Sequence, residues 1–384
     1  MALTEARGGY TRAIMLEAAG SPHTSSRPAS YQPRLASVAV IERVLLAAPR
    51  GFCAGVDMAI KALSWMIQAF DPPVYCYHEI IHNRQVVRRF EQAGVVFVDD
   101  IATVPEGRPI MLSAHGSAPE VVQAARDLGG YVVNAVCPLV TKVHHEVKTR
   151  AAKGYQIVYV GHEGHEEAVG TMAVAPEAIH RVESARGVAA LPEFKEPVAV
   201  LAQTTLSHRE WEGVLEYTKR RFPDLWQPSI SDLCFATTNR QTAMMEIAPA
   251  SDAVLVIGSA NSSNTQSLVD LAAEAGCRRV LRINDADEVP GDLSGTIGVT
   301  AGASAPEHVV WEVIDRLAPV HGTQEVTVVD EDEYFPPPRN LRNLLAAVEA
   351  AAAVTLGSSP AGRQPLNDRS IDASDLLDRL SPRG

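Results

Sequence analysis

Cysteine is scarce in this chain, with five among 384 residues, an odd number that is too small for a disulfide scaffold at this length. Basic residues are also in deficit: 34 Lys and Arg stand against 46 Asp and Glu, for a formal net charge of −12. Bulk nucleic-acid binding requires a cationic surface and is therefore not expected. The apolar runs 156–161 and 253–258 are far shorter than the roughly 20 residues of a membrane-spanning helix.

Two further absences narrow the function. Residues 1–40 contain no continuous apolar segment of the kind that begins a secretory signal. We therefore expect a cytoplasmic protein without a membrane partner, in which cysteines bind metal, act in catalysis or are inert. The chain also lacks G-x-x-x-x-G-K-[ST] and a convincing G-x-G-x-x-G, the usual sequence signatures of folds that bind nucleoside triphosphates and dinucleotides. The motifs therefore do not support either fold.

What is present is an alternation of short apolar runs and amphipathic stretches, in a composition typical of a globular protein (46% hydrophobic, 21% charged). This alternation predicts α/β architecture with mainly parallel sheets. The predicted strands cover 43–48, 73–77, 95–98, 109–113, 131–134, 156–161, 198–203, 253–258, 279–283 and 296–300. The predicted helices cover 56–70, 84–93, 141–153, 207–222, 264–275 and 306–318, and a further one is possible at 340–355.

Three cysteines share a context and set the expected domain organisation. Cys53, Cys137 and Cys234 each precede a predicted helix, at spacings of 84 and 97 residues. This spacing suggests three α/β units of similar size, each opened by one cysteine at a strand-to-helix loop. We expect a flexible extension at 1–40, α/β domains at 41–137, 138–230 and 231–335, and a partly disordered C-terminal extension at 336–384.

Loops at the carboxyl ends of parallel strands are where open α/β sheets bind ligands, so these three thiols could share one metal. Thiolates suit zinc, copper(I) or an iron–sulfur cluster. No local C-x-x-C supports a metal, however, and the spacing alone favours three buried cysteines that act as small hydrophobic residues. Cys76 and Cys277 are interpreted as structural.

The other predicted strands end in loops rich in hydroxyl, amide and imidazole groups. At helix N-termini such groups can bind an anion through backbone N–H groups and the helix dipole. Helix capping explains Ser207 and most isolated cases, but it explains less well a run of Ser262, Ser263 and Asn264. His162 and His165 lie three apart in a glycine-containing loop, which makes a helical H-E-x-x-H zinc site a weak interpretation.

Taken together, eight ordered motifs between about Val44 and Arg342 resemble the 4-hydroxy-3-methylbut-2-enyl diphosphate reductase (LytB) family. The motifs begin at Pro49 (PRGFCAGVD), His78 (HEIIHN), Ser113 (SAHG), Cys137 (CPLVTKVH), Gln203 (QTTLS), Ala236 (ATTNRQ), Asn261 (NSSN) and Thr300 (TAGASAP). The resemblance implies a trefoil of three α/β domains around a central [4Fe-4S] cluster, one per chain. It also implies that Cys53, Cys137 and Cys234 hold three irons and leave one open for substrate.

The resemblance further implies the last step of the methylerythritol phosphate route to isoprenoids. Two electrons and two protons remove the substrate hydroxyl as water and give isopentenyl and dimethylallyl diphosphate; the electrons come from a ferredoxin or flavodoxin. By position, Glu167 matches the proton-delivering acid and Thr204 the threonine near the substrate hydroxyl. The matching substrate-binding set is His82, His115, His165, Thr205, Ser262, Ser263, Asn264 and Ser304. Glu166 stands where the family usually has proline, which places a second acid beside Glu167.

Two other functions remain open at this stage. A zinc-dependent hydrolase could use Cys and His ligands with Glu167 as base. A cluster-containing redox sensor would bind no diphosphate, and the Ser262–Asn264 loop would then serve only as a helix cap.

Overall fold

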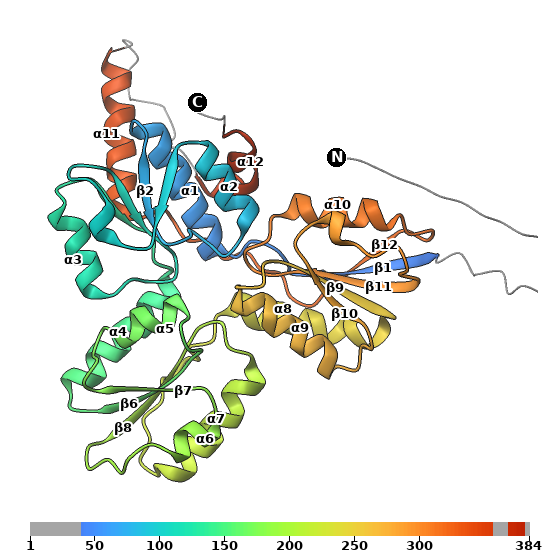
Figure 1. Ribbon diagram of the computed structural model, residues 1–384, viewed down its shortest axis with the longest axis horizontal. Coiled ribbons are helices and arrows are strands. Elements are labelled where there is room, and N and C mark those ends of the chain that lie inside the picture. The colour runs from blue at the N-terminus through green and yellow to red at the C-terminus, as the bar shows by residue number, and fades with distance from the viewer. Residues whose placement is uncertain (1–39, 356–367, 381–384) are drawn as a thin grey trace, which may run out of the picture. The chain divides into compact units, whose positions relative to one another are not determined.

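The computed structural model describes residues 40–355 and 368–380 of the chain (Figure 1). The flexibility predicted for residues 1–39 lies outside the described residues, as does most of the disorder predicted for about 358–384; at 368–380, where the structure has a helix, that prediction is wrong. The described strands form three separate sheets of five, four and three strands, and every strand pair in them is parallel. The α/β prediction is therefore confirmed. None of the described helices has both the length and the apolar character needed to cross a membrane.

The five-stranded sheet has the order β10-β9-β11-β1-β12. Its strands are β1 (Ile41–Ala48), β9 (Ala253–Ile257), β10 (Val280–Ile283), β11 (Gly295–Ala301) and β12 (Thr323–Thr327), and its helices are α9 (Ser263–Glu274) and α10 (Glu307–Leu317). Every residue of β9 is buried, as expected of a central parallel strand covered on both faces.

The four-stranded sheet has the order β3-β2-β4-β5. It contains β2 (Val74–Tyr77), β3 (Val95–Val98), β4 (Ile110–Leu112) and β5 (Val132–Asn134), together with α2 (Arg84–Gln92) and α3 (Pro119–Asp127). The three-stranded sheet, β7-β6-β8, contains β6 (Gln156–Val160), β7 (Ile179–Val182) and β8 (Val198–Ala202). Its helices are α5 (Glu166–Met172), α6 (Ala185–Ala189) and α7 (His208–Arg221).

Three helices carry the chain from one sheet to the next, and each begins immediately after one of the three cysteines. Helix α1 (Ala54–Ala69) leaves β1 of the five-stranded sheet and packs in the core of the four-stranded one. Helix α4 (Pro138–Ala152) leaves β5 and packs against β6 and β8. Helix α8 (Phe235–Ile247) follows the three-stranded unit and packs on β1. The even spacing of the cysteines thus marks the three crossings between units.

Two predictions about chain organisation are wrong in detail. The segment 41–137 does not form one domain, because β1 pairs with β11 and β12 in the five-stranded sheet. Cys234 does not follow a strand: α7 ends at Arg221, and the only described pairing in the loop that follows is an isolated bridge between Trp226 and Ala199. Both errors concern pairing between residues distant in sequence, which local hydrophobic pattern does not specify.

The C-terminal segment packs against the first crossing helix. Helix α11 (Arg339–Thr355) confirms the possible helix at 340–355, and α12 (Ala373–Asp378) follows it after the undescribed stretch. Leu341, Ala373 and Leu377 are buried in the same apolar core as α1. The buried Lys61 amino group of α1 contacts the Asp57 carboxylate at 2.6 Å and donates to the Asp368 carbonyl at 3.0 Å. The C-terminal extension is therefore structured where it is described.

Candidate active site

One cavity brings together every residue predicted for the site. It is lined by loops that follow β1, β2, β4, β5, β6, β8, β9 and β11, and by the N-terminus of α8. All but one of these are strand carboxyl ends, where parallel sheets bind ligands. The predicted residues that line it are Cys53, His82, His115, Cys137, His165, Glu167, Thr204, Thr205, Cys234, Ser262, Ser263, Asn264 and Ser304.

The three thiols occupy equivalent local positions. Cys53, Cys137 and Cys234 are the N-cap residues of α1, α4 and α8, and none of their side chains accepts a hydrogen bond from its helix. A Cβ atom built on Gly55 would lie 2.9 Å from Cys137 Sγ and 3.9 Å from Cys53 Sγ, so both sulfurs border the same small space. Glycine at this position keeps that space open.

Burial and mutual repulsion disfavour three bare thiolates here. Burial, reinforced by neighbouring Cys53, raises the pKa of Cys137 to about 12 and that of Cys234 to about 11. A cationic inorganic centre would reverse this, because a coordinating thiol is held deprotonated by the metal charge. The donor set, soft sulfur at three helix N-termini, therefore fits a metal centre.

The spacing of the three sulfurs distinguishes between a metal cluster and a single metal ion. Tetrahedral zinc with bonds of about 2.3 Å would draw its thiolates to about 3.8 Å from one another. Within the described part of the chain, the one set of three potential ligands whose donor atoms all lie within 4.8 Å is His82, His115 and Glu166. At least one pair of the three sulfurs is therefore more than 4.8 Å apart, which is wider than one zinc ion requires and favours a larger inorganic core.

Glu167 is a buried acid joined to Thr204. One Glu167 oxygen accepts from the Thr204 backbone N–H at 2.7 Å, and the other accepts from Thr204 Oγ1 at 2.9 Å. Glu167 is only 2% exposed, and burial raises its pKa to about 7 despite these two hydrogen bonds. A carboxyl group with this pKa holds a proton near neutrality and can donate it.

The neighbouring Glu166 has the opposite character. Its carboxylate lies 2.8 Å from His115 Nδ1. Burial disfavours its charge, but contact with His115 and the positive potential of nearby histidines outweigh burial and lower the pKa of Glu166. Glu166 is also outside the set that lines the cavity. The two adjacent acids therefore differ by environment: Glu167 retains a proton up to a pKa of about 7, and Glu166 is ionised beside His115.

Three imidazoles form a cluster on one side of the cavity. The His82 and His115 rings stack at 4.2 Å, and His165 meets them edge-on at 5.7 and 6.2 Å. Burial lowers the pKa of His115, and burial with the nearby histidines lowers that of His165 to about 3. His165 Nδ1 accepts from the Glu167 backbone N–H at 3.2 Å, so the neutral His165 ring carries its proton on Nε2.

Hydroxyl and amide groups complete the polar lining. Asn264 Oδ1 accepts from the Ala303 N–H at 2.9 Å, while the buried Asn264 Nδ2 has no hydrogen-bond partner. Ser262 caps α9 by accepting from the Thr265 N–H, and Thr205 Oγ1 donates to Ser263 Oγ at 3.0 Å. Ser304 Oγ donates to the His82 carbonyl at 3.1 Å. An unpartnered buried donor at the start of a helix is suited to an anion.

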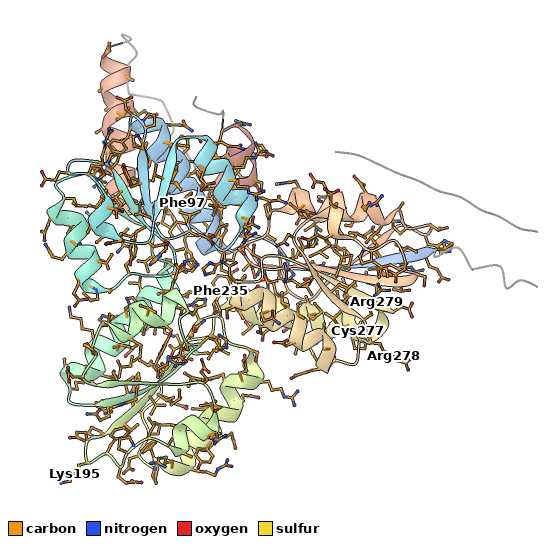
Figure 2. All side chains as sticks on the ribbon, in the orientation of Figure 1. Phe97, Lys195, Phe235, Cys277, Arg278 and Arg279 are labelled. Atoms are coloured by element: carbon orange, nitrogen blue, oxygen red, sulfur yellow. The ribbon has the colours of Figure 1, made fainter. Side chains whose placement is uncertain are left out.

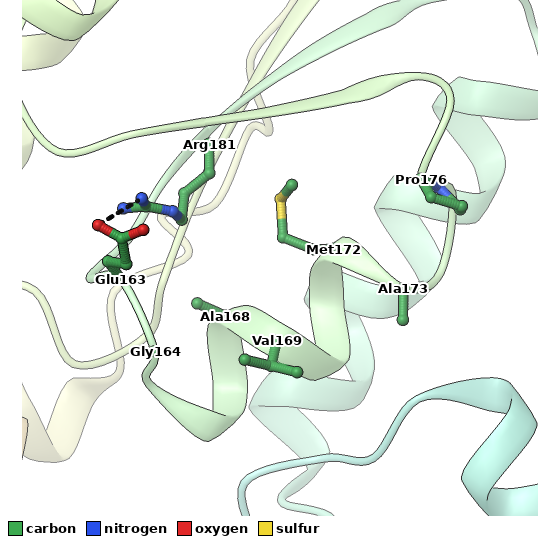
Figure 3. Close-up of a pocket in the computed structure, with 8 residues that line it drawn as sticks. All are labelled: Glu163, Gly164, Ala168, Val169, Met172, Ala173, Pro176 and Arg181. Atoms are coloured by element: carbon green, nitrogen blue, oxygen red, sulfur yellow. Dashed lines mark ion pairs between the residues drawn. The ribbon is translucent and has the colours of Figure 1, made fainter.

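Two further hollows lie near the cavity, and only one of them shares residues with it. A hollow of about 360 Å3 shares His165, Ser262 and Ser263 with the cavity, and His162 and Glu210 also line it. This hollow provides a polar approach between the loop after β6 and the loop after β9. A separate hollow of about 460 Å3 lies on the other face of α5, where Met172, Val169 and the Glu163–Arg181 ion pair line it (Figure 3). It contains none of the predicted site residues.

Other predictions about single residues can also be compared with the structure. Ser207 caps α7 in a capping box with Glu210, which confirms the capping interpretation. Cys76 is buried within β2 of the four-stranded sheet. Cys277 lies before β10, at the opposite sheet end from the cavity loops (Figure 2).

Sequence reasoning assigned no role to three residues around the cavity: Glu166, His162 and Arg240. His162 Nδ1 lies 3.4 Å from Ser263 Oγ and its Nε2 lies 3.5 Å from Glu210. Arg240 is fully buried and donates to the carbonyls of Gly51 and Ala236, each two residues from one of the cysteines. The only signal for Arg240 was its place in the motif that begins at Ala236.

Comparison with known proteins agrees with this geometry. The family model described as "LytB protein" matches residues 44–318. A 4-hydroxy-3-methylbut-2-enyl diphosphate reductase of Rhodopirellula baltica is 47% identical over 317 residues, which is 81% of this chain and 98% of the relative. The enzyme of the same name from Mycolicibacterium paratuberculosis is 45% identical and covers 79% of this chain and 93% of its own length.

A solved structure supports the same relationship. The E-1-hydroxy-2-methyl-but-2-enyl-4-diphosphate reductase of Plasmodium falciparum superposes with a TM-score of 0.78 at 30% identity and covers 80% of this chain and 99% of its own. A second structure is described as (E)-4-hydroxy-3-methyl-but-2-enyl diphosphate reductase, the terminal enzyme of the non-mevalonate pathway. It has a TM-score of 0.55 at 29% identity and covers 72% of this chain and 99% of its own. On these matches, together with the shared α/β fold, the chain belongs to the LytB family.

Proposed function

We propose that this protein reductively removes the hydroxyl group of (E)-4-hydroxy-3-methylbut-2-enyl diphosphate. Two electrons and two protons convert the allylic alcohol to isopentenyl or dimethylallyl diphosphate and water, as the last step of the methylerythritol phosphate route to isoprenoids. One observation carries the proposal: a single cavity joins three uncapped thiols, a neutral buried acid and an unpartnered amide donor. Reduction, protonation and diphosphate binding each require one of these features.

The thiols of Cys53, Cys137 and Cys234 would hold a [4Fe-4S] cluster, one per chain. Thiolate is the usual ligand of such clusters, and three protein ligands for four irons leave one position open. When bound, the cluster would supply electrons and a Lewis-acidic position for the substrate hydroxyl. The wide sulfur spacing and the N-cap position of each thiol support this assignment.

The diphosphate would bind among the imidazoles and the N-terminus of α9. Asn264 Nδ2 and His165 Nε2–H are donors available to its oxygens. His82 and His115 are stacked beside them, and imidazole rings can donate hydrogen bonds to an arriving anion. Ser262, Ser263, Ser304 and Thr205 supply hydroxyl groups on the same wall. This arrangement explains how a site poor in Lys and Arg can hold a strong anion.

Glu167 would deliver the proton that leaves with the hydroxyl as water. Its pKa of about 7 leaves about half of the carboxyl group protonated at neutral pH, and both of its oxygens are fixed by Thr204. Thr204 also lines the cavity, so its hydroxyl can exchange the Glu167 contact for one with the substrate hydroxyl. Delivery from a group fixed before substrate arrives avoids the cost of orienting it during the reaction.

Electrons must come from another molecule, and we assign this role to a ferredoxin- or flavodoxin-type donor. The described cysteines are all free thiols, which suits a reducing compartment, and we place the enzyme in the cytoplasm. The test is anaerobic incubation of the reconstituted protein with a reduced donor and the substrate. Formation of both five-carbon diphosphates supports the proposal. A zinc-loaded, colourless protein that hydrolyses substrates would contradict it and would assign the His82, His115 and Glu166 group to a metal.

A further inference from the structure

Arg240 of α8 is the most completely buried cation near the three thiols, with 0% of its surface exposed. Its guanidinium joins two of the cysteine segments. Nη2 donates to the Gly51 carbonyl at 2.8 Å and to the Phe52 carbonyl at 3.3 Å, immediately before Cys53. Nη1 donates to the Ala236 carbonyl at 2.8 Å, two residues after Cys234.

The loop that Arg240 holds is also fixed from its other side. Gly51 and Cys53 donate their backbone N–H groups to the carbonyls of Ala301 and Ala303, each at 3.2 Å. Gly51 has a φ of +67°, and a Cβ there would lie 3.2 Å from the Ala305 carbonyl, so the loop requires glycine. Arg240 therefore completes a closed set of bonds that determines where Cys53 Sγ lies relative to Cys234 Sγ.

The charge of Arg240 is balanced by a single acid from the C-terminal segment. Both oxygens of Glu331 lie 3.1 Å from Arg240 Nη1, and the Glu331 side chain is only 10% exposed. Asn239 Nδ2 fixes the same carboxylate at 2.9 Å. Phe335 of this segment packs against Phe235, the first residue of α8, with ring centroids 6.3 Å apart. Both Glu331 and Phe335 lie beyond residue 318, where the family-model match ends.

We propose that Arg240, balanced by Glu331, is a positioning residue that fixes the Cys53 loop against the start of α8 and sets the reduction potential of the metal centre held there. This inference rests on the cluster assigned above to the three cysteines. Adding an electron to a buried cluster adds negative charge, which a nearby fixed cation favours and a fixed anion disfavours. Removing Arg240 and removing Glu331 should therefore shift the potential in opposite directions.

The experiment compares three variants with the wild type after anaerobic reconstitution, with iron and sulfide content measured first. Arg240→Met should make the potential more negative, and Glu331→Gln should make it more positive. Arg240→Lys keeps the charge but cannot hold Glu331 and the Gly51 and Phe52 carbonyls with two separate nitrogens, so its potential should stay close to that of the wild type while its cluster is lost faster. Loss of a purely structural contact would shift the potentials of the Met and Gln variants in the same direction or not at all, and that result would overturn the inference.

A second readout needs no cluster. In the metal-free protein, alkylation of Cys53 followed by mass spectrometry should be faster in Arg240→Met than in the wild type. Cys277, which is buried in a different apolar cluster from the one that Cys53 packs against, should label at an unchanged rate. If the wild type takes up no iron or sulfide, the proposed cofactor is wrong and the claim about potential is wrong with it. Unchanged Cys53 labelling would contradict the positioning role by itself.

Discussion

The helices that begin at the cavity fall into two groups with different N-caps. Helices α1, α4 and α8 begin at cysteines whose side chains make no capping bond. Helices α5 and α9 begin at His165 and Ser262, whose side chains accept a backbone N–H of the first turn. Sulfur is a weak acceptor, so a cysteine N-cap leaves its helix uncapped and leaves the thiol available. The same N-cap position thus presents thiols suited to a metal on one side of the cavity and fixed polar groups on the other.

The largest expected effect comes from replacing one of the three N-cap cysteines. Cys137→Ser should remove the metal centre and reduce turnover by roughly a thousandfold or more, because a hydroxyl is a poor replacement for a soft thiolate ligand. Cys277→Ser is the matched control, since that buried thiol lies outside the cavity and should leave iron and sulfide content unchanged. Metal analysis and turnover check both variants, and full iron and sulfide content in Cys137→Ser would contradict the assignment.

The next largest effect comes from the two acids in the first turn of α5, the helix that His165 caps. Glu167→Gln should lower kcat by about 10²- to 10⁴-fold, the usual range for loss of a general acid. Glu166→Gln should raise KM more than it lowers kcat, because Glu166 acts through His115. Steady-state kinetics on both variants distinguish the two acids. Near-normal turnover in Glu167→Gln together with loss of turnover in Glu166→Gln would reverse the assignment.

The pH dependence should reflect the same acid. Because Glu167 must be protonated to act and its pKa is about 7, kcat/KM should fall as the pH rises through neutrality. A pH profile of the wild type that stays flat from pH 6 to about 9 would show that another group supplies the proton.

Stability provides an independent measure of Glu167. Its folded-state pKa lies above the ordinary value of 4.5, so its ionisation does not affect stability below that pH and reduces stability as the pH rises through about 7. The full penalty is on the order of 3 kcal/mol at 1.36 kcal/mol per pH unit. Urea unfolding of the metal-free protein at pH 5 and about 8 should show a smaller loss in Glu167→Gln than in the wild type. Glu166→Gln, whose wild-type pKa is lowered, should match the wild type over this range.

The smallest expected effect comes from removing the Ser262 side chain that caps α9. Ser262→Ala should cost about 1 kcal/mol of stability, the usual value for loss of a serine N-cap. Asn264→Ala removes both the unpartnered Nδ2 donor and the Oδ1 acceptor of the Ala303 N–H, so it should raise KM more than Ser262→Ala does. Thermal unfolding of Ser262→Ala and KM of both variants check these expectations. A larger rise of KM in Ser262→Ala than in Asn264→Ala would remove the distinction between capping and binding on this wall.

The sequence was informative where a short segment carries its own signal. The parallel strands other than β7 and β12 were predicted from local pattern, and the predicted site residues that line the cavity came from the ordered motifs. The strand partners of β1 could not be predicted, because β11 and β12 lie about 250 residues later and any buried apolar strand could pair with them. The separation of Glu166 from Glu167 likewise depends on contacts with His115 and Thr204, which belong to other parts of the chain.

The most direct test is the inorganic content of the protein purified and reconstituted without oxygen. The account predicts about four irons and four sulfides per chain, with one iron whose Mössbauer signal changes when the substrate diphosphate is added. Substituting any of the three cysteines at these N-cap positions should remove that centre. One zinc per chain with no sulfide, or an iron centre retained after all three are replaced, would contradict the claim that these thiols hold a cluster with an open position.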